Sequence, residues 1–161
     1  MTSSILQAAT LLTALGCGLV AGVFFAFSTF VMPGLGRLPA PVGAAAMRSI
    51  NITAITPLFM TTLFGTGVAG LALAGWAAFS LDEPAAPFVL AGGLLYLLGT
   101  VAVTVVKNVP LNDELAPLEP DSAEAALVWQ RYLRAWTAWN SVRTVAALVA
   151  AALLIAALMK A

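Results

Sequence analysis

Aromatic rings, one amide and one guanidinium follow each other at helical spacing in the last third of the chain. They are Trp129, Tyr132, Trp136, Trp139, Asn140 and Arg143. At about 100° of rotation per residue, they share a sector of roughly 100° on one helix face. Aromatic faces stack on flat rings, and amide and guanidinium groups stabilise developing negative charge. The face therefore passes from aromatic rings to an amide and a guanidinium, which predicts either an aromatic site with polar groups at one end or a belt of packing tryptophans.

A second group of polar residues precedes this face. Asn108, Asn112 and Asp113 flank Pro110, and Asn51 ends an earlier connection. Because proline lacks a backbone donor and restricts the residue before it, we expect a helix to end at Pro110 and both asparagines to lie on irregular backbone. Irregular backbone at membrane depth needs protein or a watery cavity around it. We therefore expect these residues to border a cavity.

The chain has no histidine and a single cysteine, Cys17. This excludes histidine-ligated haem and zinc, Ser-His and Cys-His dyads, CxxC redox pairs and structural disulfides. A protein base would then have to be a carboxylate, with Asp113 and Glu114 as the candidates, unless a ligand itself takes the proton. A metal site built from carboxylates alone is disfavoured, and we expect no cofactor.

The elements that must position these groups are membrane helices. Of 161 residues, 61% are hydrophobic and 9% are charged, whereas an ordinary soluble domain has about 25% charged residues. Seven Lys/Arg balance seven Asp/Glu, so no basic field attracts nucleic acid. Apolar stretches of membrane-spanning length occupy about residues 5–32, 53–79, 87–106 and 139–159. We predict one all-α domain over residues 1–161, an integral membrane four-helix bundle with a longer connection before the fourth helix.

Arg143 is the only charged residue inside these stretches. A guanidinium about one turn inside a span is costly unless it snorkels to the headgroups, has a charged partner or faces a polar cavity. Asp113 and Glu114 are the candidate partners.

Local signals predict three further features. A short interfacial helix is expected to begin near Pro41. Asp121 or Ser122 is expected to cap a helix that runs unbroken into the fourth span. Gly18 and Gly22 form a small-xxx-small pair, which is typical of close helix packing in membranes.

Two motifs together resemble a known family. They are Asn108-x-Pro110-Leu111-Asn112 and Trp136-x-x-Trp139-Asn140-x-x-Arg143. This pattern is similar to that of the DUF1772 membrane proteins, which include the anthrone oxygenases of aromatic polyketide pathways. The phenylalanine-rich residues 22–27, and the stretch 47–51 before Pro57-x-Phe59, extend the resemblance over nearly the whole chain.

The resemblance implies a four-helix membrane protein that oxidises an anthrone to an anthraquinone with O2, without an evident metal or flavin. The partners would be membrane lipids, a hydrophobic aromatic small molecule and O2. Catalytic candidates are Asn140, Arg143, Asn108, Asn112 and Asp113. Substrate-binding candidates are Trp129, Tyr132, Trp136, Trp139 and Asn51.

Two other classes stay open from the sequence. A membrane protein without catalytic activity could hold a lipid, a quinone or a partner helix in the same cavity. A small transporter is less favoured, because no span carries a central carboxylate for a proton or a cation. The oligomeric state, including a homo-oligomer, is also open.

The basic residues predict the topology. Arg37 and Arg48 lie in the connection 33–52, and Lys107, Arg131 and Arg134 lie in the connection 107–138, whereas Lys160 lies near the C-terminus. By the positive-inside rule, both connections are cytoplasmic and both termini lie outside.

Two fusions test this topology. A fluorescent protein fused to the C-terminus should give no fluorescence, and a phosphatase fused to the C-terminus should give high activity. The opposite result would contradict the topology predicted from the basic residues.

Overall fold

The backbone is helical in every regular element of the part that the structure describes. The computed structural model describes residues 4–119 and 121–160. Four of its helices are long and apolar enough to cross a membrane: Ser4–Leu35, Pro57–Ala78, Ala86–Leu115 and Ala123–Leu158. The prediction of an all-α membrane bundle is confirmed, and the chain is a membrane protein.

Three of the four spans are composite. The first joins α1 (Ser4–Ala26), a π-helical segment (Phe27–Val31) and α2 (Met32–Leu35). The second joins α4 (Pro57–Met60), a π-helical segment (Thr61–Gly65) and α5 (Thr66–Ala78). The third joins α6 (Ala86–Tyr96), two π-helical segments (Leu97–Ala102 and Thr104–Asn108) and α7 (Val109–Leu115). The fourth is α8 (Ala123–Leu158) alone, and the short helix α3 (Ala40–Thr53) lies between the first two spans.

The predicted helix end at Pro110 is wrong. Pro110 lies in the first turn of α7, where its missing N–H is tolerated. The π-helical segment directly before α7 changes which carbonyl groups lie near the proline ring, because its hydrogen bonds span five residues rather than four. Asn108 and Asn112 are therefore helical. Most of the predicted long connection 107–138 is helical, since it falls in the π-helical segment Thr104–Asn108, in α7 and in α8.

Other local predictions fare better. The short helix expected near Pro41 is confirmed as α3, which begins at Ala40. Ser122 caps α8, because its hydroxyl accepts a hydrogen bond from the amide of Ala125 at 3.0 Å. The second span was expected to begin near residue 53, but α3 continues to Thr53 and α4 begins only at Pro57. The helical conformation is therefore interrupted between α3 and α4.

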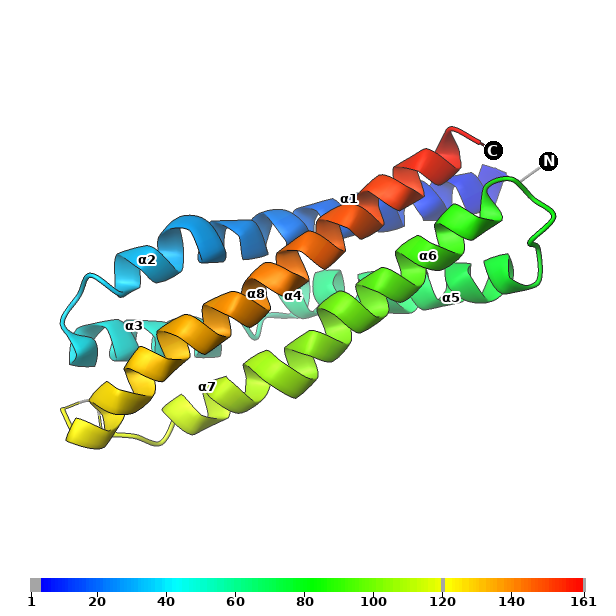
Figure 1. Ribbon diagram of the computed structural model, residues 1–161. Coiled ribbons are helices and arrows are strands. Elements are labelled where there is room, and N and C mark those ends of the chain that lie inside the picture. Colours follow the sequence, from blue (N-terminus) through cyan, green and yellow to red (C-terminus); the bar gives the residue numbers. More distant parts are fainter. Residues whose placement is uncertain (1–3, 120, 161) are drawn as a thin grey trace.

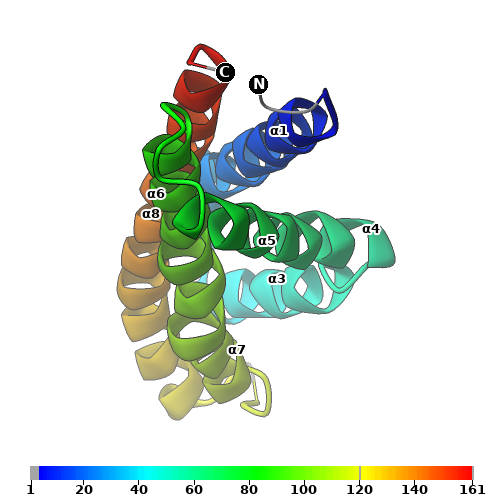
Figure 2. The same ribbon diagram turned by 90° about the vertical axis from the view of Figure 1, so that its right-hand side faces the viewer.

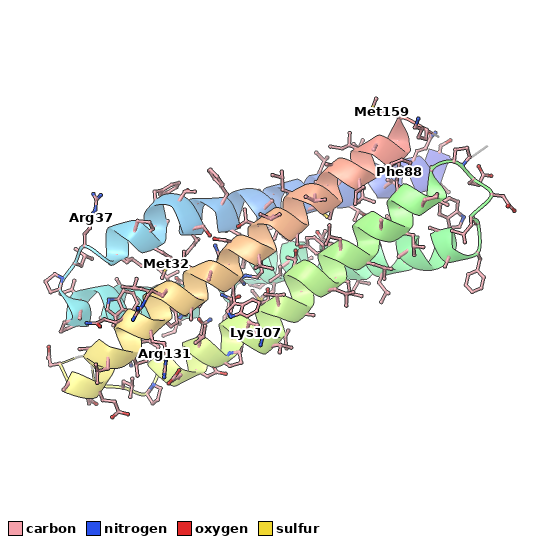
Figure 3. All side chains as sticks on the ribbon, viewed as in Figure 1. Met32, Arg37, Phe88, Lys107, Arg131 and Met159 are labelled. Carbon is pink, nitrogen blue, oxygen red and sulfur yellow. The ribbon has the colours of Figure 1, made fainter. Side chains whose placement is uncertain are left out.

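Both described chain ends and the α5–α6 turn lie at one end of an elongated bundle (Figure 1). The α2–α3 and α7–α8 connections lie at the other end. Figure 2 shows α4 and the adjoining end of α3 projecting to the side away from α8. Figure 3 shows Arg37 and Arg131 at the end opposite to Phe88 and Met159.

The interior has two parts. Toward the α5–α6 turn it is built from small side chains of α1, α5, α6 and α8, with Cys17 fully buried among them. Toward the opposite end lies an aromatic cluster, made of Met32, Ala44, Met47, Leu115, Trp129, Tyr132 and Trp136. This second part positions the polar groups of α8.

Glycines allow α5 and α6 to pack closely. A Cβ atom on Gly93 would lie 2.4 Å from the carbonyl oxygen of Gly70, so α5 and α6 meet backbone to backbone. The packing predicted for Gly18 and Gly22 is wrong within this chain. A Cβ on either residue would have no other atom within 4 Å, because both lie on the outer face of α1.

Gly93→Ala should destabilise the bundle, whereas Gly18→Ala should not. The new methyl at Gly93 meets backbone that cannot rotate away, and overpacking of this kind costs about 1–3 kcal/mol. At Gly18 the methyl is unopposed, and alanine favours a helix over glycine by about 1 kcal/mol. Thermal unfolding in detergent, followed by circular dichroism, measures both. Equal midpoints for the two variants would contradict the close contact.

Candidate functional site

A cavity of about 640 Å³ lies in the half of the bundle that holds the aromatic cluster. Residues of α3 and of all four spans line it. Its walls are mainly aromatic and aliphatic, with rings from Phe24, Phe27, Phe59 and Trp136. The volume falls within the range of about 300–1,000 Å³ that is usual for small-molecule sites.

Arg143 lies in this wall although its side chain is only 4% exposed. Its Nη2 donates to Oδ1 of Asn140 at 2.7 Å, and its Nη1 donates to the hydroxyl of Thr104 at 3.1 Å. Its Cζ lies 4.0 Å from the ring centroid of Phe24 and 5.2 Å from that of Trp136. Cation–π contacts of this kind strengthen when they are shielded from water. The guanidinium is thus fixed between two aromatic rings.

Of the alternatives that the sequence left open for Arg143, a charged partner is not found among the described residues. Glu114 pairs instead with Arg131, and both side chains are largely exposed. Asp113 lines the cavity but makes no ion pair with Arg143. The Nε atom of Arg143 is buried without a hydrogen-bond partner among the described residues. Because the guanidinium stays protonated, the cavity wall carries a positive charge that no carboxylate of the described residues neutralises.

Asn140 lies behind this arginine and does not line the cavity. It is fully buried, and its Nδ2 donates to the carbonyl of Phe24 at 2.6 Å and to the hydroxyl of Ser28 at 2.7 Å. Both acceptors lie where α1 passes into its π-helical segment. Since its oxygen accepts from Arg143, Asn140 links α1 to the guanidinium and orients it.

Asn112 lines the cavity from α7. Its Oδ1 accepts from the hydroxyl of Tyr132 at 2.8 Å and from Nε1 of Trp136 at 2.9 Å. These bonds connect α7 to α8 and hold the Trp136 ring against the cavity. Asn51 of α3 also lines the cavity, and its Nδ2 lies 3.4 Å from the Tyr132 hydroxyl.

The predicted aromatic face divides into three parts. Trp129, Tyr132 and Trp136 form a stack with centroid separations of 5.7 and 5.9 Å, but only Trp136 reaches the cavity. Trp129 is covered by α3, where a Cβ on Gly43 would lie 2.9 Å from its ring. Trp139 points elsewhere and carries Lys107 over its ring at 4.9 Å. Trp129 and Tyr132 therefore support the site rather than border it.

Asn108 is also set back from the cavity. Its side chain is 1% exposed, and its Nδ2 donates to the carbonyl of Trp136 at 3.1 Å. Its Oδ1 has no hydrogen-bond partner among the described residues. Asn108 thus ties the third span to α8 one turn below Asn112.

Sequence reasoning missed three residues that shape the site. Phe24 and Phe59 appeared only within stretches that carried the family resemblance, and Thr104 carried no signal because a threonine in a span usually bonds its own helix. It does so here, through the carbonyl of Thr100 at 2.7 Å, and it also accepts from Arg143. Within the described ranges, no group of three or more His, Cys, Asp or Glu side chains could hold a metal ion.

Fold and site together define a class: a helical membrane protein with an aromatic cavity and a buried, unpaired arginine in its wall. The family model of the anthrone oxygenases matches residues 56–153, which is more than half of the chain. The chain belongs to the anthrone oxygenase family, and the resemblance seen in its motifs is confirmed. Neither a curated protein nor a solved structure matches the chain.

Asn140→Ala should destabilise the protein strongly. The substitution removes the acceptor of Arg143 and leaves a buried donor and a buried carbonyl without partners, at about 1–3 kcal/mol for each unsatisfied group. Ser141→Ala is the matched control, because Ser141 bonds Ser28 and its own helix at a half-buried position and should cost less than about 1 kcal/mol. Unfolding midpoints of the two variants in detergent test this, and a difference near zero would contradict the linking role of Asn140.

Proposed function

We propose that this protein oxidises a flat, phenolic polycyclic substrate of the anthrone type with O2 to the corresponding quinone. The family supports an oxygenase-like membrane protein. The observation that carries the finer proposal is Arg143, a buried guanidinium that lies between two aromatic rings in the wall of a cavity of about 640 Å³.

The reaction requires the protein only to bind the substrate, to remove one proton and to stabilise the resulting anion. Loss of one methylene proton turns an anthrone into an aromatic oxyanion, which passes one electron to O2. The resulting radical and superoxide combine through a new C–O bond to a peroxide anion, which takes back the proton and becomes a hydroperoxide. Loss of water from this hydroperoxide, with cleavage of the O–O bond and of the remaining C–H bond, leaves the quinone. Anthrone and O2 thus give anthraquinone and water.

Each residue of the cavity has a role in this proposal. Arg143 stabilises the oxyanion by its positive charge. The rings of Phe24, Phe27 and Trp136 hold the flat substrate. Asp113 is the only carboxylate that lines the cavity in the described ranges, and it takes the methylene proton. Asn140 and Asn108 position α8 and need not touch the substrate.

The proposal also includes further partners and the orientation of the protein in the membrane. Membrane lipids and O2 are the further partners, and the substrate is hydrophobic. The end of the bundle with Arg37, Arg48, Lys107, Arg131 and Arg134 is assigned to the cytoplasm by the positive-inside rule. The cavity would then open in the cytoplasmic half of the membrane.

Arg143→Gln should lower the rate of anthrone-dependent O2 consumption by about a hundredfold or more, the usual cost of losing one oxyanion donor. Arg143→Lys keeps the charge without the planar donor set and should fall between Gln and the native residue. An oxygen electrode and the absorbance of the quinone measure the reaction in purified protein. Spontaneous oxidation in buffer with lipid is subtracted.

Arg134→Gln is the matched control, since Arg134 is an exposed arginine of the same helix, and it should retain the native rate. Asp113→Asn tests the base and should lower the rate at neutral pH while leaving ligand binding intact. A native rate in Arg143→Gln would overturn the site, and a native rate in Asp113→Asn would assign proton removal to the phenolate of the substrate.

One observation favours a second candidate. No carboxylate contacts Arg143 among the described residues, so the cavity is also suited to hold an anionic or quinone-like ligand without turnover. A binding protein of this kind would show saturable binding of an anthraquinone at the cavity and no O2 consumption above the lipid blank.

A further inference from the structure

The amide of Asn112 has a defined orientation. An indole Nε1–H is only a donor, so the atom of Asn112 that Trp136 contacts at 2.9 Å must be the oxygen. The hydroxyl of Tyr132 donates to the same oxygen at 2.8 Å. Two donors therefore occupy Oδ1, and a flipped amide would lose both bonds.

This orientation leaves Nδ2 of Asn112 for the cavity. Nδ2 makes no hydrogen bond to any described residue, and Asn112 is a lining residue. An amide nitrogen carries two N–H donors. Among the described residues, the N–H donors on Nδ2 are thus the polar groups of Asn112 that have no partner, and they are assigned to the cavity surface.

Trp136 sets the separation between this amide and Arg143. The guanidinium carbon lies 5.2 Å from the centroid of the ring, and the amide oxygen lies 2.9 Å from the nitrogen at the edge of the same ring. Both groups therefore contact the same indole, Arg143 over its face and Asn112 at its edge. A ligand of two or three fused rings is long enough to reach from one group to the other.

We propose that Asn112 determines ligand specificity by donating from Nδ2 to a second ligand oxygen. The preferred ligands are polycyclic aromatics that carry one oxygen at Arg143 and a carbonyl or ether oxygen on a ring remote from it. The inference rests on the proposed function for the role of Arg143, but it concerns binding and does not require turnover. It assigns Asn112 to substrate selection rather than to the stabilisation of the oxyanion.

The test compares two probes, a naphthol and the same naphthol with a methoxy group on the ring remote from the hydroxyl. Binding is measured by titration calorimetry on protein in lipid nanodiscs, with empty nanodiscs subtracted. The native protein should bind the methoxy probe about three- to tenfold more tightly, which is the contribution of one hydrogen bond. Asn112→Asp keeps both acceptor bonds to Tyr132 and Trp136, and it should abolish or reverse this preference.

The leucine side chain in Asn112→Leu has neither a donor nor an acceptor, so this variant should also lose the preference for the methoxy probe. It replaces Asn112→Asp in the test if the aspartate variant does not fold. Tyr132→Phe removes one bond to Oδ1 but leaves the bond from Trp136, so the preference should persist. Arg143→Gln should weaken both probes equally and keep their ratio. A native ratio in Asn112→Asp or Asn112→Leu would overturn the inference. Absent O2 consumption with an intact ratio in the native protein would overturn only the proposed reaction.

Discussion

A guanidinium in the membrane interior is the constraint on which the rest of this structure depends. A translocon-based scale gives about 2.5–3.5 kcal/mol for an arginine at the centre of a spanning helix. The bundle offsets this cost with two polar bonds, to Asn140 and Thr104, and with two aromatic faces. No carboxylate neutralises it within the described residues. The charge is therefore solvated by the protein but left available to an anion.

The asparagines have different structural roles, which the sequence does not distinguish. Asn140 and Asn108 are buried and bond backbone carbonyls of other helices at 2.6 and 3.1 Å. Such bonds hold helices together where lipid supplies no hydrophobic drive. Three of the four π-helical segments contribute residues to the cavity wall, at Phe27–Val31, Thr61–Gly65 and Thr104–Asn108. Local departures from the α-helix and interhelical amides thus shape one half of the molecule, while small residues pack the other.

The sequence predicted the spans and the polar face of α8, because hydropathy and helical period are local properties. It did not predict which members of that face reach the cavity. Trp129 is covered because α3 approaches it closely at Gly43, and this depends on the packing of a helix some eighty residues away. The helix at Pro110 was missed for a similar reason, since the preceding π-helical segment leaves no mark in the residue pattern. Thr104 became a partner of Arg143 only through the packing of the third span on α8.

The break between α3 and α4 bears on how affinities for this protein have to be measured. The second span has 22 residues, about 33 Å at 1.5 Å per residue, so its first turn lies near the edge of the roughly 30 Å hydrocarbon layer. Ile52 and Ile55, just before it, line the cavity and are 73% and 72% exposed. These exposed side chains therefore place an apolar edge of the cavity at the expected boundary of the hydrocarbon layer, within reach of a ligand dissolved in the lipid. A hydrophobic ligand is at equilibrium with this site through its mole fraction in the lipid, so dissociation constants expressed in total aqueous concentration will rise as lipid is added, even when the protein is unchanged.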